Sequence, residues 1–170
     1  MIQDIPDPQW MHRDDVQWAY KAIIDLDLTF DALGFVQHLE PFERLFKTYP
    51  EMRTVIDHGM KPKISEREFD HWAEVMQRIA TQQHVYCKCS GLFTEAREGD
   101  GVEAIGPYVQ HLRASFPDNR LMWGSDWPVL TLNGNYSAWF ELVQSVCGTP
   151  ESQPALFGGS AAEFYRIAID

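Results

Sequence analysis

Polar side chains follow three apolar runs of the sequence, at positions where they could do chemistry. Asp57 and His58 come directly after RTVI, Lys88 and Ser90 lie in and after VYCKC, and Asp126 closes RLMWGSD. In parallel α/β folds the carboxyl ends of the strands meet at one edge, so such side chains can form one site. A carboxylate at that edge could act as a general base or, with an imidazole beside it, could bind a metal ion.

Asp126 stands between two tryptophans, Trp123 and Trp127, in the run RLMWGSDWPV. One interpretation is a helix cap or a carboxylate bonded to backbone at the end of a strand, and Pro128 suits a cap. The other is a general base or metal ligand whose proton affinity is raised by partial desolvation between the two rings. The pattern by itself leaves both interpretations open.

For the other polar residues near the strand ends, a structural role and a functional role can be compared in the same way. His58 precedes a glycine, which lets a ligand approach closely, and this favours a functional histidine. Lys88 lies between Cys87 and Cys89 in a strand, where a buried ammonium needs a protein partner or a substrate anion. His38 opens the helix after the first strand and either caps that helix or contacts substrate. We expect substrate contacts from four side chains: His38, Lys88, Ser90 and Trp127.

The hydrophobic pattern predicts the elements that position these residues. Strands are expected at about 28–36, 53–58, 85–91 and 120–126. Helices are expected at about 14–27, 39–49, 65–82, 102–115, 136–146 and 159–168. Ser65 and Glu68 form a capping box that predicts the start of the third helix. Strand and helix alternate with roughly 30 residues per unit, the pattern of βαβ crossovers and a parallel sheet, so the fold class is α/β.

Composition limits the partners and the compartment. The chain has 25 acidic and 14 basic residues and a net charge of -11, which argues against nucleic acid or an anionic membrane as a partner. Three cysteines without a CxxC pair suit a reducing compartment. The start MIQDIPDP does not resemble a signal peptide, and no apolar run is long enough to span a membrane. We therefore expect a cytoplasmic protein with a small-molecule substrate.

Four blocks of the sequence, in order, resemble the C-terminal half of the amidohydrolase-related proteins. The blocks are VIDHGMKP (55–62), VYCKCSGLFTEA (85–96), RLMWGSDWPV (120–129) and LFGGSAAEFYRI (156–167). The likeness is greatest to the TIM-barrel hydrolases that include sugar-acid and dicarboxylate lactonases, and it covers nearly all of residues 1–170. It implies a single domain built of about the last four β/α units of a (β/α)8 barrel, truncated on its N-terminal side, since the typical barrel has roughly 250 residues.

The resemblance also implies a reaction. His58 matches the family's later-strand histidine and Asp126 its final-strand aspartate. The expected activity is hydrolysis of a lactone, or of a related cyclic ester or amide, by water, with Asp126 as general base and an organic acid lactone as substrate. Some relatives use zinc or another divalent metal, for which His58 and Asp126 would be ligands, and others use no metal. Both modes stay open, because this chain has no His-x-His pair.

A second hypothesis starts from the edges of the predicted sheet. Four strands leave two unpaired edges, which a closed barrel would join. The alternative is a catalytically impaired half-barrel that folds by self-association, as a homodimer, or with an N-terminal partner chain.

Overall fold

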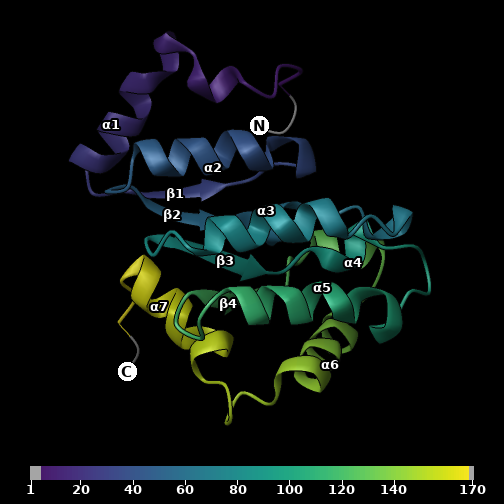
Figure 1. The fold of residues 1–170 in the computed structure, drawn as a ribbon. Helices are drawn as coiled ribbons and strands as arrows, with labels where there is room; N and C mark the ends of the chain where they lie inside the picture. Colours follow the sequence, from purple (N-terminus) through teal and green to yellow (C-terminus); the bar gives the residue numbers. More distant parts are fainter. Residues whose placement is uncertain (1–4, 169–170) are drawn as a thin grey trace.

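A four-stranded parallel sheet runs through the centre of the computed structural model, which describes residues 5–168 (Figure 1). Its strands are β1 (Thr29–Ala32), β2 (Arg53–Ile56), β3 (Val85–Cys89) and β4 (Leu121–Trp123). They lie in the order in which they occur in the sequence, and each neighbouring pair is parallel. The α/β prediction with its parallel sheet is therefore confirmed, although each strand is shorter than the apolar run that predicted it.

In the described residues, seven α-helices accompany the sheet. They are α1 (Gln17–Asp25), α2 (Leu39–Thr48), α3 (Asp70–Ala80), α4 (Leu92–Glu95), α5 (Val102–Ser115), α6 (Tyr136–Cys147) and α7 (Ser160–Tyr165). Helices α2, α3 and α5 lie side by side over one face of the sheet (Figure 1). Among the described residues, no helix is both long and apolar enough to cross a membrane.

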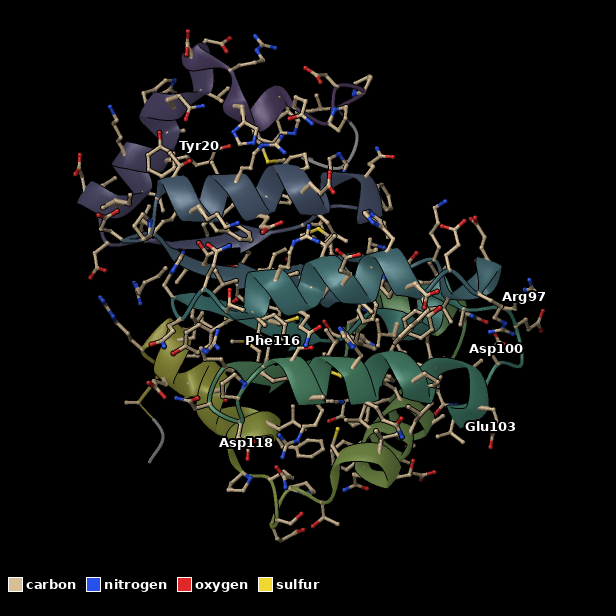
Figure 2. All side chains as sticks on the ribbon, viewed as in Figure 1. Tyr20, Arg97, Asp100, Glu103, Phe116 and Asp118 are labelled. Carbon is tan, nitrogen blue, oxygen red and sulfur yellow. The ribbon has the colours of Figure 1, made fainter. Side chains whose placement is uncertain are left out.

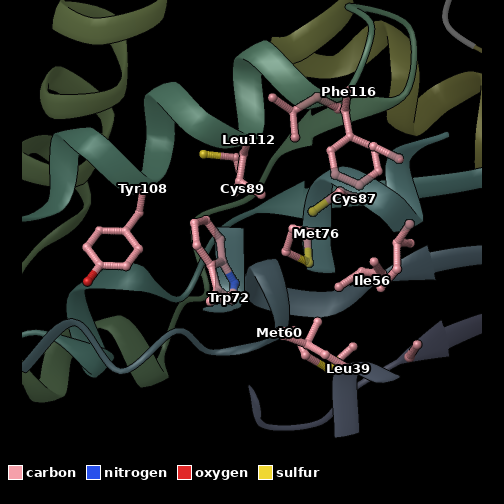
Figure 3. Close-up of a cluster of buried hydrophobic side chains, with 14 of the residues drawn as sticks. Leu39, Ile56, Met60, Trp72, Met76, Cys87, Cys89, Tyr108, Leu112 and Phe116 are labelled. Atoms are coloured by element: carbon pink, nitrogen blue, oxygen red, sulfur yellow. The ribbon is translucent and has the colours of Figure 1, made fainter. Parts of the chain in front are cut away.

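The main hydrophobic core lies between the sheet and these helices. Alternate strand residues such as Ile56 and Cys87 point toward the helices, because successive side chains of a strand face opposite ways. Trp72 and Met76 of α3 and Leu112 of α5 fill the space between them (Figure 3). Each such side chain contributes about 1.5–3 kcal/mol when it is fully buried, so this cluster holds the helices on the sheet.

A smaller core covers the opposite face of the sheet. Val55 and Met122 of the strands contact Phe164 of α7, with Tyr86 beside them. Helix α7 is anchored near the amino ends of the strands, where Arg53 donates a hydrogen bond to the Phe164 carbonyl. Figure 1 shows α7 at the end of the sheet away from the arrowheads. The opposite end, to which the strands point, is left for a site.

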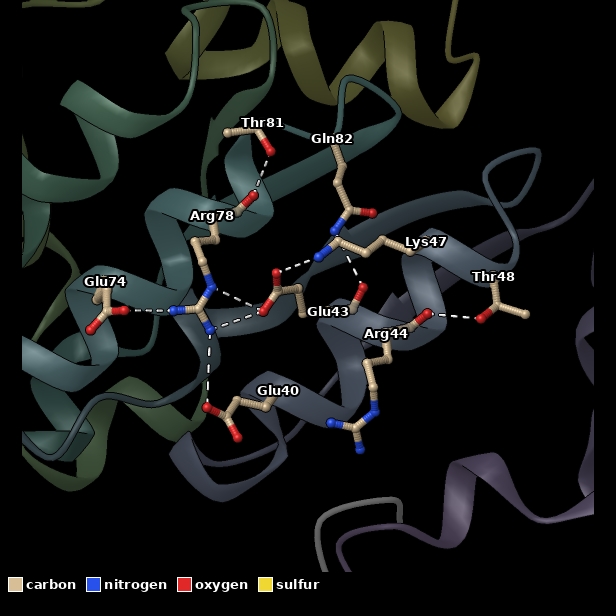
Figure 4. A network of polar contacts seen from close by, with 9 residues as sticks. All are labelled: Glu40, Glu43, Arg44, Lys47, Thr48, Glu74, Arg78, Thr81 and Gln82. Atoms are coloured by element: carbon tan, nitrogen blue, oxygen red, sulfur yellow. Dashed lines mark hydrogen bonds and ion pairs between the residues drawn. The ribbon is translucent and has the colours of Figure 1, made fainter.

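A buried carboxylate joins α2 to α3. Glu43 is 7% exposed and accepts hydrogen bonds from Lys47 at 2.7 Å and from Arg78 at 3.0 Å (Figure 4). Burial opposes the charged form, but the two cations outweigh it and lower the pKa of Glu43. Because both helices also pack on the sheet, this ion pair fixes their mutual position.

The predicted start of the third helix is wrong. Helix α3 begins at Asp70, and Ile64–Glu66 form a separate 3₁₀ turn. Arg67, with φ of +61°, ends that turn in a left-handed conformation that a helix cannot continue. Glu68 pairs with Lys63 at 3.3 Å instead of capping the helix. The S-x-x-E pattern therefore occurs here without its usual geometry.

Candidate active site

Four of the six predicted site residues lie together in a cleft at the carboxyl end of the sheet. The cleft has a volume of about 420 Å³. Its lining residues are Asp57, His58, Lys88, Ser90, Met122, Trp123, Gly124, Asp126, Ala161 and Tyr165. His58 follows β2, Ser90 follows β3 and Asp126 follows β4, so the parallel topology brings them together as expected.

A larger cavity of about 640 Å³ lies near the loop before α5 and contains none of the predicted residues. Arg67 and Asp100 line it, and they bind each other through a bidentate ion pair. Asp100 lies at the outer end of this loop, and Glu103 lies in the first turn of α5 (Val102–Ser115) (Figure 2). Among the described residues that line this cavity there is no histidine to act together with a carboxylate, although the cavity is larger than the cleft.

The backbone that carries His58 makes a left-handed turn. His58, Gly59, Met60 and Lys61 have φ values of +51°, +53°, +60° and +48°. A non-glycine residue pays roughly 1–2 kcal/mol for this conformation. The indole of Trp72 supports the turn, because its Nε1 donates a 2.7 Å hydrogen bond to the Gly59 carbonyl. Strain of this kind is typical of functional sites.

The His58 ring lies between a hydroxyl and a carboxylate. Its Nδ1 is 2.8 Å from Ser90 Oγ, and its Nε2 is 3.5 Å from Asp126 Oδ1. Gly91 allows the ring this position, because a Cβ on Gly91 would lie 2.7 Å from His58 Cγ. The imidazole and the carboxylate thus share one small volume in which a substrate carbonyl and a water molecule could be held.

The surroundings of His58 favour its neutral form. Burial lowers the pKa of His58 and the nearby Lys61 and Lys88 ammonium groups lower it further, which outweighs the opposite effect of Asp126 and Asp57. Near neutral pH the ring is therefore an uncharged imidazole. It can donate one hydrogen bond and accept another.

Asp126 also has a left-handed backbone, with φ of +57°. The carbonyl of the nearby Gly124 accepts a 2.8 Å hydrogen bond from Trp139 Nε1, which fixes the start of the loop. Trp123 lines the cleft, whereas Trp127 is 70% exposed and lies outside the lining. The structure thus places one of the two flanking tryptophans beside Asp126 at the cleft and turns the other toward solvent.

Lys88 binds two carboxylates of the protein itself. Its Nζ lies 2.7 Å from Asp31 Oδ2 and 2.6 Å from Asp57 Oδ1. Tyr165 of α7 donates a 2.6 Å hydrogen bond to the same Asp31 oxygen. Burial opposes the ammonium form, but these hydrogen bonds raise the pKa of Lys88, while burial and Asp31 raise that of Tyr165 to about 12. Of the two kinds of partner considered for the Lys88 ammonium, a protein group and a substrate anion, the structure shows protein carboxylates, those of Asp31 and Asp57.

His38 lies apart from the cleft. It is 0% exposed, and its Nδ1 accepts a 3.0 Å hydrogen bond from the Phe35 backbone N–H. Burial lowers the pKa of His38, so the ring is neutral. His38 is the residue before α2, but its side chain caps the preceding 3₁₀ turn (Val36–His38) instead of α2, and no His38 atom is among the groups that line the cleft.

The pattern of polar residues missed Asp31 and Tyr165. Asp31 is the one charged side chain in TFDA and lies on the face opposite Phe30 and Ala32, the same face as Lys88. That alternation was the available signal. Tyr165 gave none, because only the packing of α7 on the sheet brings its hydroxyl to Asp31.

The donor set in the cleft does not by itself make a metal centre. His58 and Asp126 offer one nitrogen and one carboxylate, whereas catalytic zinc sites use three protein ligands. Within residues 5–168, no group of three or more His, Cys, Asp or Glu side chains is placed to hold a metal ion. The described part of the chain therefore does not fit a complete zinc site.

Comparison with known proteins gives consistent results. The Amidohydrolase family model matches residues 5–167. An L-fucono-1,5-lactonase from Burkholderia ambifaria is 38% identical over 173 residues, which cover 98% of this chain and 60% of that protein. An L-fucono-1,5-lactonase from Burkholderia multivorans is 33% identical over 154 residues, covering 83% of this chain and 52% of that protein.

A solved structure shows the same arrangement. An amidohydrolase from Burkholderia multivorans, crystallised with bound zinc, matches with a TM-score of 0.89 and 28% identity, over 98% of this chain and 63% of that chain. This chain thus spans between about half and 60% of the length of the two curated lactonases. The predicted fold class, a partial (β/α)8 barrel with a parallel sheet, is confirmed, because nearly the whole chain matches 63% of an amidohydrolase structure.

Proposed function

Because the chain belongs to the amidohydrolase family, we propose that its cleft takes part in hydrolysing a lactone, or a related cyclic ester or amide, with Asp126 as general base. The observation that carries this proposal is the 3.5 Å separation of His58 Nε2 and Asp126 Oδ1 at the carboxyl end of the sheet. Two similar proteins are named L-fucono-1,5-lactonase, which favours the lactone of an organic acid as substrate.

The proposed reaction needs one proton acceptor and one group that polarises the carbonyl. Asp126 takes a proton from water as the water oxygen bonds to the carbonyl carbon. His58 donates a hydrogen bond to the carbonyl oxygen, on which negative charge develops. When the tetrahedral intermediate collapses, the bond from the carbonyl carbon to the ring oxygen breaks. That oxygen then receives the proton held by Asp126, which leaves a hydroxy acid.

The remaining cleft residues have supporting roles in this proposal. Lys88 holds Asp57 and Asp31 in place and limits their repulsion of Asp126, and it does not need a substrate carboxylate as partner. Trp123 supplies an apolar wall of the cleft. Trp127, being exposed, could touch only a part of the substrate that extends beyond the cleft. A divalent metal would need ligands beyond His58 and Asp126.

The experiment is an assay of the chain with sugar-acid 1,5-lactones, in which acid release is followed with a pH indicator. Asp126→Asn should lower kcat by about 10²–10⁴-fold, the usual contribution of a general base. Asp25→Asn, which removes an exposed carboxylate of α1, is the matched control and should leave the rate unchanged. Hydrolysis that persists at the parent rate in Asp126→Asn would contradict the proposal.

A second candidate is a half-barrel that acts only with another chain. In residues 5–168, β1 pairs only with β2 and β4 only with β3, so each has an edge that could accept a further strand. Sedimentation of the purified chain tests this candidate, because a homodimer would have twice the chain mass of 19.6 kDa. We also propose a cytoplasmic location, which the free cysteines Cys87, Cys89 and Cys147 favour.

A further inference from the structure

Ser90 is buried, and its hydroxyl faces His58. The residue is 2% exposed, and in the described part of the chain the hydrogen bond of Ser90 Oγ is the one to His58 Nδ1, at 2.8 Å. A hydroxyl that is buried with a single partner must donate its proton to that partner or leave the proton without an acceptor. An unpaired buried donor costs free energy, so donation from Ser90 to Nδ1 is the favoured arrangement.

The surroundings of the other ring nitrogen, His58 Nε2, also favour an acceptor at Nδ1 and a proton on Nε2. His58 Nε2 faces Asp126 Oδ1, and an ionised carboxylate can only accept hydrogen bonds. A protonated Nε2 is attracted to that oxygen, whereas a bare lone pair would be repelled by it. A neutral imidazole carries one proton, and both neighbours are satisfied when that proton is on Nε2.

We propose that Ser90 is a positioning residue that holds His58 in the tautomer with its proton on Nε2. The Ser90 hydroxyl donates to Nδ1, and the Nε2–H then points into the cleft. His58 thereby becomes a hydrogen-bond donor toward a bound carbonyl oxygen. That last consequence rests on the proposed function, whereas the tautomer itself does not.

Local packing keeps the ring in this place. A Cβ on Gly91 would meet His58 Cγ at 2.7 Å, and one on Gly124 would meet Ser90 Cβ at 3.2 Å. Two glycines thus let the Ser90 side chain and the His58 ring lie against the backbone that follows β3 and β4. With so little room, the ring cannot flip to exchange its nitrogens without moving that backbone.

The tautomer is tested by NMR of the ring nitrogens of ¹⁵N-histidine-labelled chain, with His58 assigned from a His58→Gln variant. We expect the proton on Nε2 in the parent chain and a mixture of tautomers in Ser90→Ala. Ser160→Ala is the matched control, because Ser160 is also buried and its Oγ bonds only the Asp118 carbonyl in the described structure. The control should leave the His58 signals unchanged. A parent chain with the proton on Nδ1, or a Ser90→Ala variant with the parent tautomer, would overturn the proposal.

Kinetics provide the second readout. In lactone hydrolysis, Ser90→Ala should lower kcat about tenfold with KM nearly unchanged, since one hydrogen bond to the ring is lost. Ser90→Cys keeps a weak donor of similar size and should recover part of the loss. An unchanged kcat in Ser90→Ala would contradict the positioning role. If the parent chain does not hydrolyse lactones, the proposed function fails, and the NMR result alone decides the tautomer.

Discussion

The ammonium of Lys88 lies 2.6 Å from Oδ1 of Asp57, the residue that directly precedes the left-handed turn carrying His58. The same ammonium binds Asp31, so its loss leaves two carboxylates facing each other. We expect Lys88→Met to lower the free energy of unfolding by about 2–3 kcal/mol, somewhat less than for a fully buried pair, because the Asp31 side chain is 36% exposed. Urea unfolding measures this change.

Lys63 is the matched control for Lys88. It also lies between two carboxylates, Glu66 and Glu68, each at 3.3 Å, but in an exposed position. Lys63→Met should therefore change the urea midpoint little. In the double variant Lys88→Met with Asp57→Asn, part of the lost stability should return, because one repelling charge is removed. Equal losses for Lys88→Met and Lys63→Met would refute this account of the pair.

Alanine substitutions at Gly91 and Gly99 distinguish the effect of backbone strain from the effect of contact with the His58 ring. Both have positive φ, +65° and +81°, so alanine strains the backbone at either position by about 1 kcal/mol. A Cβ at Gly91 also strikes the His58 ring, whereas a Cβ at Gly99 meets nothing within 4 Å. Gly91→Ala should reduce lactone hydrolysis on the order of 10–100-fold by displacing the ring, and Gly99→Ala should not. Similar rates for the two variants would show that the contact does not matter.

Three histidines outside the cleft make stability depend on pH. Burial lowers the pKa of His38, His84 and His111 from 6.5. Below about pH 6.5 the unfolded chain therefore binds more protons than the folded chain, so their stabilising contribution is present above pH 6.5 and is lost as pH falls through the folded pKa values. The urea midpoint should decrease between about pH 6.5 and pH 5. His111→Asn should reduce this slope, and a midpoint that rises on acidification would disprove the assignment.

The sequence was sufficient to locate much of the cleft, because the location depends on topology. Apolar runs that end in polar residues predict strand ends, and a parallel sheet brings those ends together. His58, Lys88, Ser90 and Asp126 meet for this reason. The directions in which the side chains point could be predicted less well from the sequence. Trp123 and Trp127 both flank Asp126 in the sequence. Only Trp123 lies within a strand, whose pleat fixes the direction of its side chain.

Contacts between distant segments could not be read from local patterns. Asp31 is 57 positions from Lys88, and Tyr165 is 134 positions from Asp31. The left-handed turn was also hidden, because Gly59 is the one glycine among its four residues and Met60, which follows it, gives no sign of a positive φ. Both residues adopt positive φ in the structure, so a glycine relieves strain at either position.

The indole of Trp72 links the core to the strained turn, and its removal gives the last prediction. Its Nε1 donates to the Gly59 carbonyl at 2.7 Å, in the middle of the left-handed residues 58–61. Trp72→Phe leaves that buried carbonyl unpaired, which should cost about 1–3 kcal/mol of stability and slow lactone hydrolysis by letting His58 move. Tyr108→Phe is the control, because Tyr108 packs on the same indole but donates to Glu68, outside the turn. If both variants lose stability while hydrolysis stays at the parent rate, the turn does not depend on Trp72 to hold His58. A selective loss of rate in Trp72→Phe would mean that the core of the fold stabilises the strain on which the site depends.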